Sequence, residues 1–240
     1  MSILFLFCAA VVGGALNAVA GGGSFIGLPA LIYAGVPPVA ANATNAFALL
    51  PGSLSSALAY RRELTTPARW LAVLLAVSVA GGLLGAVLLI RTSDTGFLRL
   101  LPWLMLLAAA TFTFGRNFRP SRQPQLAVVL LLQFLLSIYG GYFGGGMGIM
   151  MLATMTLAGM KDIHEMNGLK SVLAVGINGV AVLQFIASRA IEWRYGLIMM
   201  AGAIVGGYLG AAYARRIDQR WLRGFIMVIA WTMTIYFFVR

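Results

Sequence analysis

Seven long apolar runs constrain this chain more than any other feature of its sequence. Each approaches the roughly 20 residues that a helix needs to cross the hydrocarbon core of a bilayer. Backbone polar groups in lipid are satisfied only by helices or closed barrels, and the alternating pattern of barrel strands is absent. The sequence therefore predicts an all-α polytopic membrane protein in contact with the lipid bilayer. The runs are Ser2–Ala20, Trp70–Ile90, Leu98–Phe114, Leu126–Tyr139, Leu169–Ala187, Leu197–Ala214 and Leu222–Val239.

Charged residues make up only 10% of the chain and avoid these runs. The net charge of +11 comes from 17 basic residues, and all but Lys170 lie in or near expected loops, where they set topology. No basic and aromatic surface for nucleic acid is evident. The six carboxylates also lie near helix ends or loops, and the single cysteine allows no metal cluster. We therefore expect no enzyme, no metal and no cofactor.

Two segments with three consecutive glycines show that the chain repeats itself. A shift of 123 residues places Gly21–Gly23 on Gly144–Gly146, and a shift of 125 places Asn42 on Asn167. The same shift of 125 superposes the glycine-rich segments 81–86 and 206–211. The sequence thus predicts two homologous transmembrane repeats, 1–116 and 125–240, joined by a linker at 117–124 within the most polar stretch.

Each repeat contains five apolar segments, of which the second is short and follows the glycines. If the short segments do not cross the membrane, the repeats are parallel and the loop arginines and lysines divide nine against seven. If they cross, the repeats are inverted and the division is eleven against five. The positive-inside rule favours the second arrangement, with both termini outside. We expect five plus five inverted segments, including eight full-length spans, whereas re-entrant short segments are the alternative. The segments are 2–20, 24–36, 39–60, 67–90 and 97–115 in the first repeat and 125–143, 147–160, 164–188, 194–214 and 220–239 in the second.

The paired glycine segments are typical of a binding site in a secondary transporter. A helix that begins in the membrane directs unpaired backbone N–H groups and partial positive charge at a ligand. Glycine lets that ligand approach the backbone closely. Helices starting near Ser24 and Met147 would therefore bind an anion. Close helix packing is the alternative reason for the glycines.

A polar stripe follows each short segment. Asn42 and Ser53 are eleven residues apart, as are Asn167 and Asn178, and eleven residues return to nearly the same helix face. Lys170 is the one charge expected within a span, where it either belongs to a functional site or snorkels towards the carboxylates one to two turns earlier. Hydrogen bonding between helices is the alternative role of the stripes. Asn45, Lys170 and Ser171 extend the two stripes at i+3 or i+4.

These two stretches resemble the TauE/SafE (DUF81 or TSUP) family of membrane transporters. The resemblance rests on GGGSFIGLPALIYAGVPPVAANATNAFALLPGS at 21–53 and GGGMGIMMLATMTLAGMKDIHEMNGLKSVLAVGIN at 144–178, and extends to the length and repeat layout of the whole chain. Family members are proposed to export sulfite or organosulfonates. The resemblance implies a small-anion exporter in a bacterial inner membrane.

We therefore expect a secondary transporter that works by alternating access at a site between the repeats. An anion channel and a subunit of a larger membrane complex are the alternatives, and a homo-oligomer is possible. Oxyanions are bound by N–H groups, amides, hydroxyls and cations. The expected substrate-binding residues are Gly21, Gly22, Gly23, Ser24, Asn42, Asn45, Gly144, Gly145, Gly146, Asn167, Lys170, Ser171 and Asn178.

Overall fold

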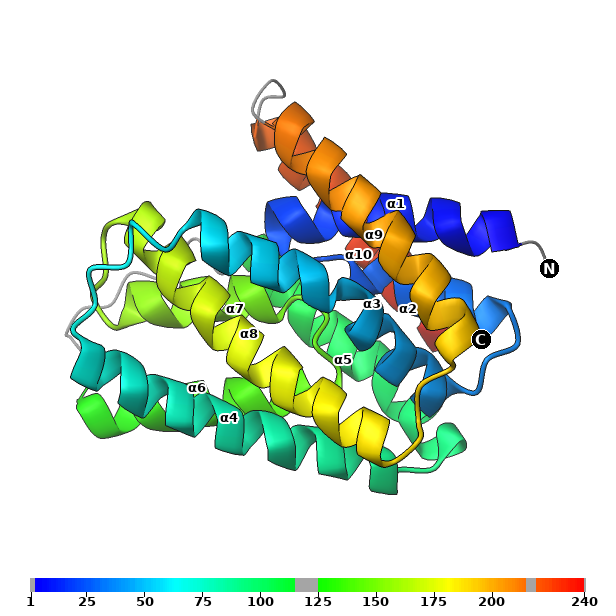
Figure 1. Ribbon diagram of the computed structural model, residues 1–240, viewed down its shortest axis with the longest axis horizontal. Helices are drawn as coiled ribbons and strands as arrows, with labels where there is room; N and C mark the ends of the chain where they lie inside the picture. The colour runs from blue at the N-terminus through cyan, green and yellow to red at the C-terminus, as the bar shows by residue number, and fades with distance from the viewer. Residues whose placement is uncertain (1–2, 115–124, 215–218, 240) are drawn as a thin grey trace.

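The computed structural model describes residues 3–114, 125–214 and 219–239, and these residues form ten α-helices. The expected linker at 117–124 lies outside the described residues. Figure 1 shows the helices coloured along the chain. They are α1 (Ile3–Ala20), α2 (Ser24–Tyr33), α3 (Pro38–Ala59), α4 (Ala68–Arg91), α5 (Asp94–Phe114), α6 (Leu126–Tyr142), α7 (Met147–Leu157), α8 (Ile163–Ala187), α9 (Trp193–Ala214) and α10 (Gln219–Val239).

The prediction of an all-helical chain with two short helices is confirmed. Helices α2 and α7 contain 10 and 11 residues, and each follows a glycine segment. Among the described residues, three helices are both long and apolar enough to cross a bilayer by themselves, namely α4, α5 and α8. Shorter apolar stretches occur in α1, α2, α6, α7 and α10. The expectation of eight full-length spans therefore stays a prediction.

The helix ends gather at two opposite ends of the molecule. At the first end, Phe5 at the start of α1 contacts the ring of Tyr33 at the end of α2. There the start of α3 is also joined to the start of α5, because the Val39 N–H donates to Asp94, and the Glu192 N–H just before α9 donates to Thr44 of α3. At the second end, the loop after α3 lies on the start of α8, where Thr66 donates a hydrogen bond to Glu165 across 3.2 Å. Helix α3 therefore runs from the first end to the second.

Glycines allow the long helices to pack closely in two places. Gly202, Gly206 and Gly210 of α9 lie against α1, and a methyl group at Gly202 would lie 2.6 Å from the carbonyl oxygen of Phe7. Gly81 and Gly85 hold α4 against α6 in the same way. Small residues spaced four apart let helix backbones approach closely in a membrane, where the hydrophobic effect contributes little to helix association.

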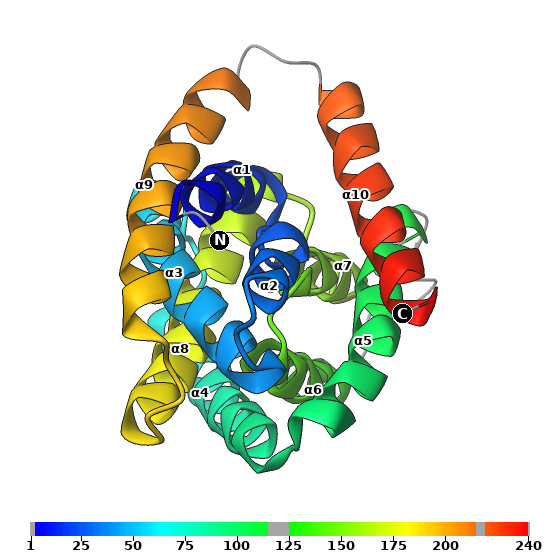
Figure 2. The same ribbon diagram turned by 90° about the vertical axis from the view of Figure 1, so that its right-hand side faces the viewer.

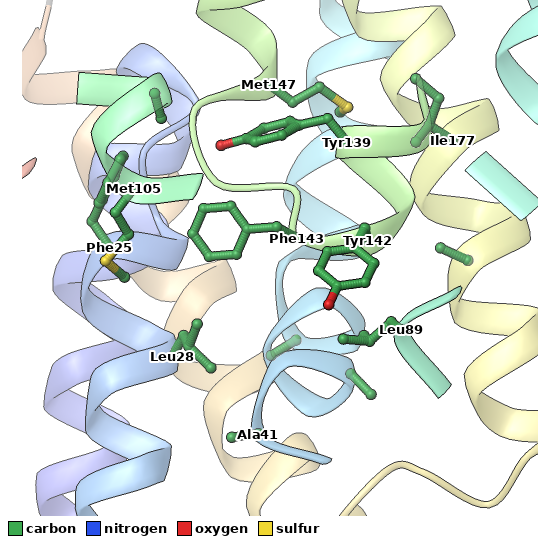
Figure 3. Close-up of a cluster of buried hydrophobic side chains, with 14 of the residues drawn as sticks. Phe25, Leu28, Ala41, Leu89, Met105, Tyr139, Tyr142, Phe143, Met147 and Ile177 are labelled. Atoms are coloured by element: carbon green, nitrogen blue, oxygen red, sulfur yellow. The ribbon is translucent and has the colours of Figure 1, made fainter. Parts of the chain in front are cut away.

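The two short helices lie inside the bundle, between the longer helices (Figure 2). Helix α2 contacts α1, α3 and α10, and α7 contacts α5, α6 and α8. Aromatic residues at the end of α6 fill the space beside them. Figure 3 shows the ring of Phe143 pointing towards the side of Phe25 and Met105, while Tyr142 points towards Leu89. Phe25, Phe143 and Met105 are at most 3% exposed, so this region is a packed core.

Large apolar side chains cover much of the outer surface of the long helices. Trp103 on α5 and Tyr208 on α9 are 61% and 78% exposed. An exposed apolar surface of this kind matches contact with lipid tails better than contact with water. Together with the apolar helices, it identifies a multi-pass membrane protein. Further members of the surface are Leu84, Leu88, Leu107, Leu131, Leu135, Leu197, Ile204, Phe225, Val228 and Ile235.

Candidate functional site

The two glycine segments meet each other near the centre of the bundle. The Gly146 N–H donates a hydrogen bond to the carbonyl oxygen of Gly21 across 3.3 Å. Gly21, Gly144 and Gly146 have φ angles of +73°, +78° and +76°. Residues with a side chain rarely adopt this left-handed conformation, so the sequence needs glycine where each chain segment reverses direction. The N–H of Gly146 therefore faces the partner glycine segment.

Packing explains Gly23 and Gly145, two of the three remaining glycines of the triplets. A methyl group at Gly23 would lie 2.6 Å from the carbonyl oxygen of Gly13 on α1, and one at Gly145 would lie 2.6 Å from the ring of Phe143. The Gly145 carbonyl also accepts a 2.6 Å hydrogen bond from the Tyr139 hydroxyl. Gly22 is buried, and its carbonyl accepts a hydrogen bond from Phe25. Gly22, Gly23, Gly145 and Gly146 thus lie away from the cavities described next.

Two adjoining cavities lie beside the glycine segments, between α1, α3, α6, α7 and α8. Their volumes are about 30 and 70 Å³. Because a water molecule needs roughly 10–15 Å³ on this measure, they have room for a few waters or a small ion. Asn17, Ser53, Gly144 and Asn178 line both cavities. Ser24, Asn42 and the backbone of 140–141 belong to the first cavity alone, and Gly21, Ser56, Gly148, Lys170 and Ser171 to the second alone.

Among the described residues that line the two cavities, Lys170 alone has a charged side chain. It is half-buried, and its Nζ donates a 2.9 Å hydrogen bond to Oδ1 of Asn167. The carboxylates earlier in the chain have other contacts, because Asp162 caps α8 and Glu165 accepts a hydrogen bond from Thr66. The ammonium group therefore has an amide partner and remains able to donate to a ligand, since it has three N–H groups.

The start of α7 adds backbone donors beside this lysine. A methyl group at Gly148 would lie 3.5 Å from Cδ of Lys170, so the backbone and the lysine stem are in close proximity. Met147, Ile149 and Met150 donate their N–H groups to the preceding turn. Within the part of the chain that the structure describes, the N–H of Gly148 has no hydrogen-bond partner. It lies in the first turn of a helix, where the partial charge is positive.

The two predicted polar stripes face each other where α3 crosses α8. The Asn178 amide donates to the Ser53 hydroxyl across 3.3 Å. One turn away, the hydroxyls of Ser56 and Ser171 are 2.9 Å apart. Asn167 lies outside both cavities, where its amide donates to the Ile163 carbonyl. Only part of the second stripe therefore reaches the cavities.

The two asparagines of the first stripe differ in their surroundings. Asn42 lines the first cavity and donates a 2.8 Å hydrogen bond to the carbonyl oxygen of Tyr142. Asn45 lies outside both cavities, where it donates to the hydroxyl of Ser24 and its Oδ1 packs against Gly27 on α2. Asn45 thus connects α3 to α2.

Sequence reasoning missed Asn17, Ser56 and Gly148 as cavity-lining residues, and counted Ser53 in a stripe without including it in the site. Asn17 is the only amide in the apolar α1 and comes four residues before Gly21, so its position was a usable signal. Ser56 lies one turn after Ser53 on the same helix. No comparable pattern separates Gly148 from the other glycines around it.

The second cavity combines the donors that an oxyanion requires. It offers one ammonium group, the hydroxyls of Ser56 and Ser171, the amide of Asn178 and the first turn of α7. Charge-assisted hydrogen bonds from such groups are stronger than neutral ones. Among the described residues, no cluster of three or more histidine, cysteine, aspartate or glutamate side chains could hold a metal ion.

Comparison with known proteins gives a consistent result over nearly the whole chain. The family model described as "Sulfite exporter TauE/SafE" matches residues 6–237. A probable membrane transporter protein of Haemophilus influenzae is 33% identical over 238 residues, which cover 97% of this chain and 92% of the relative. The probable membrane transporter protein ORF9 of a Sinorhizobium species is 31% identical, with coverages of 97% and 91%. The probable membrane transporter protein YfcA of Escherichia coli K12 is 26% identical, with coverages of 95% and 87%. No solved structure matches the chain significantly.

Proposed function

Because this chain belongs to the sulfite exporter TauE/SafE family, a transporter family and not an enzyme family, we propose that it is a secondary transporter that exports a small anion. The substrate is sulfite or an organosulfonate, which fits the family description. The transporter works by alternating access at the two cavities, which lie between its two repeats. Its relatives are bacterial, and helical bundles belong to inner membranes whereas barrels belong to outer ones, so we place it in the inner membrane.

The observation that carries this proposal is the group of donors around the second cavity. Lys170 provides a full positive charge, and Gly148 provides an unpaired N–H from the first turn of a helix. A half-buried cation within a membrane span is costly unless it has a function or an opposite charge beside it, and Asn167, the partner of Lys170, is neutral. An oxyanion between Lys170 and α7 would compensate the lysine charge and satisfy the N–H together.

The pattern of helix contacts supports two repeats related by a pseudo-two-fold axis. If α1–α5 correspond to α6–α10, the contact of α1 with α9 has its counterpart in that of α6 with α4. The contact of α4 with α8 likewise has its counterpart in that of α9 with α3. The contacts of α3 with α8 and of α5 with α10 each join a helix to its own counterpart in the other repeat, as expected for helices that lie next to the axis. Ser53 and Asn178, which are hydrogen-bonded, are equivalent under the shift of 125 residues.

The same geometry supports inverted repeats. The contact between Phe5 and Tyr33 places the start of α1 and the end of α2 at one end of the molecule, so α1 and α2 together go in and return. An odd number of passes, α3 to α5, then remains in the first repeat, so the second repeat begins on the opposite side and is inverted relative to the first. The cavities lie at the meeting point of the two glycine segments, where rocking of one repeat against the other would open them alternately to each side.

Replacement of Lys170 by glutamine tests the proposed function directly. A hydrogen bond to a charged group contributes about 1.5–3 kcal/mol, which corresponds to a roughly 10- to 150-fold weaker binding of sulfite. Lys161→Gln is the matched control, because Lys161 is the only other lysine and is exposed in the turn after α7. Sulfite binding is measured by calorimetry on the purified chain, and counterflow is measured in proteoliposomes.

We expect Lys161→Gln to bind and transport like the wild type. Equal sulfite affinity in both variants would remove Lys170 from the site. Saturable counterflow by the purified wild type would support a carrier that needs no other subunit. Ion flux without counterflow would instead identify an anion channel, and a complete lack of binding and flux for sulfite and organosulfonates would contradict the proposed function.

A further inference from the structure

The amide of Asn42 has an orientation that leaves its oxygen without a partner. Asn42 is 2% exposed, and its Nδ2 donates to the carbonyl oxygen of Tyr142. A carbonyl cannot donate a hydrogen bond, so a flipped amide would place two acceptors against each other. Oδ1 of Asn42 is therefore fixed as an acceptor, and it has no hydrogen-bond partner. A buried acceptor without a hydrogen-bond partner is costly to a fold, which is the first indication of a ligand.

The rest of the first cavity consists of neutral groups rich in oxygen. The hydroxyls of Ser24 and Ser53 and the amides of Asn17 and Asn178 line it. The last turn of α6 completes the wall with the backbone of residues 140–141, whose carbonyl groups accept no hydrogen bond from the part of the chain that the structure describes. The carboxyl end of a helix carries partial negative charge.

This chemistry favours a small alkali cation over an anion or a proton. Hard cations are bound by carbonyl, amide and hydroxyl oxygens. Broken helices in transporters present their carbonyl ends to coupling ions in the same way. None of the side chains that line this cavity titrates between pH 4 and 10, so a proton has no carrier there.

We propose that the first cavity binds Na⁺, with Oδ1 of Asn42 as a ligand, and that this ion is coupled to the anion in the second cavity. The inference rests on the proposed function for the anion, and adds the source of energy for transport. Asn17, Ser53, Gly144 and Asn178 line both cavities, so the two ions would lie side by side. Opposite charges in adjacent sites stabilise each other, and the coupling is reciprocal in the two affinities.

Asn45 provides a matched control on the same helix. It lies three residues after Asn42, is 1% exposed, and also has an Oδ1 without a hydrogen-bond partner. That oxygen packs against Gly27 and not against a cavity. A general effect of losing a buried amide from α3 would therefore appear in both Asn42→Ala and Asn45→Ala, whereas loss of a Na⁺ ligand would appear only in the first.

The test measures thermal unfolding and sulfite binding of the purified full chain in NaCl and in choline chloride. In the wild type, we expect Na⁺ alone to raise the unfolding midpoint in a saturable manner and to strengthen sulfite binding about 5- to 150-fold. Asn42→Ala should lose both effects while its sulfite affinity in choline chloride stays within about threefold of the wild type. Asn45→Ala, which removes a donor to Ser24 but leaves the Ser24 hydroxyl in the cavity wall, should keep both. If Asn42→Ala does not fold, Ser24→Ala, which removes another oxygen of the first cavity, should weaken the Na⁺ response.

The outcomes separate this inference from the proposed function. Sulfite binding that is the same in both salts, together with no stabilisation by Na⁺, would overturn the Na⁺ site and leave the anion site standing. If Na⁺ stabilises the wild type but not Asn42→Ala, and no sulfite binds, the Na⁺ site would be supported and the proposed anion site in the second cavity would be contradicted. A Na⁺ response that survives in both Asn42→Ala and Ser24→Ala would also overturn the inference.

Discussion

Replacement of Gly146 by alanine should destabilise the protein by an amount that the structure lets us calculate. Gly146 has a φ angle of +76°, and a left-handed conformation costs a residue with a side chain about 1–2 kcal/mol. Its new methyl group would lie 2.7 Å from Cβ of Ala108 on α5, and overpacking of this kind costs about 1–3 kcal/mol. The expected total is about 2–5 kcal/mol, a large part of a typical folding free energy of about 5–15 kcal/mol.

Gly148→Ala, two residues later, is the matched control with the opposite expectation. Gly148 has an ordinary helical backbone, and its methyl group would lie 3.5 Å from Cδ of Lys170, which is normal van der Waals contact. Alanine is also the better helix former by about 1 kcal/mol. The fold should therefore be as stable as the wild type, whereas the second cavity becomes narrower and sulfite binding weaker.

The assay is thermal unfolding of both variants in the same detergent, followed by sulfite titration. For a chain of this length, 1 kcal/mol corresponds to about 2–4 °C, so Gly146→Ala should lower the midpoint by roughly 4–20 °C. Gly148→Ala should leave the midpoint unchanged or slightly raised. Equal destabilisation by both substitutions would refute the reasoning, because it would mean that backbone conformation and the contact with Ala108 do not distinguish the two glycines.

Two further predictions concern topology and helix packing. In a cysteine-free background, cysteines placed at Pro38 and at Arg119, which lies outside the described residues, should react with impermeant reagents from opposite faces of the membrane; reaction from the same face would contradict inverted repeats. Gly206→Leu should abolish folding because the side chain would collide with the backbone of Val11, whereas Gly207→Leu, whose nearest neighbouring atom is 3.9 Å away, should be tolerated. The yield of monodisperse protein after detergent extraction measures folding of the two glycine variants. Equal yields of Gly206→Leu and Gly207→Leu would refute the packing of α9 on α1.

Much of the fold was predictable because the signals for it are local. Apolar runs near bilayer length indicate helices wherever they occur, and the glycine segments mark where α2 and α7 begin. The helix bounds agree with the predicted segments to within a few residues at most ends. The division of basic residues between the two sides of the membrane cannot be compared with the structure in the same way. It includes arginines at 116, 119, 122, 215 and 216, which lie outside the described residues. The division of eleven against five therefore stays a prediction.

Which residues line the two cavities was only partly predictable, and the differences share one cause. Helical spacing grouped Asn42 with Ser53, and both line the first cavity. It also grouped Asn167 with Asn178, but Asn167 lines neither cavity. Spacing gives the relative direction of side chains on one helix, whereas the neighbour that each direction meets depends on how the helix is rotated and tilted. Helix α8 contacts α3 beside the cavities, so Asn178 reaches them, whereas Asn167 lies in the second turn of α8 and accepts a hydrogen bond from Lys170.

By itself, the sequence determined that this protein is embedded in a lipid bilayer, that it is helical, that two of its helices are short, and that it resembles one family. These properties follow from hydropathy and glycine content, which act over a few turns of the chain. Only the tertiary structure decided that the N–H of Gly146 donates to the carbonyl oxygen of Gly21. It also decided that Asn17 and Ser56 line the cavities whereas Asn45 does not. These are contacts between segments far apart in the chain. They depend on the crossing of α3 with α8 and the packing of α1 on α9, which no local pattern specifies.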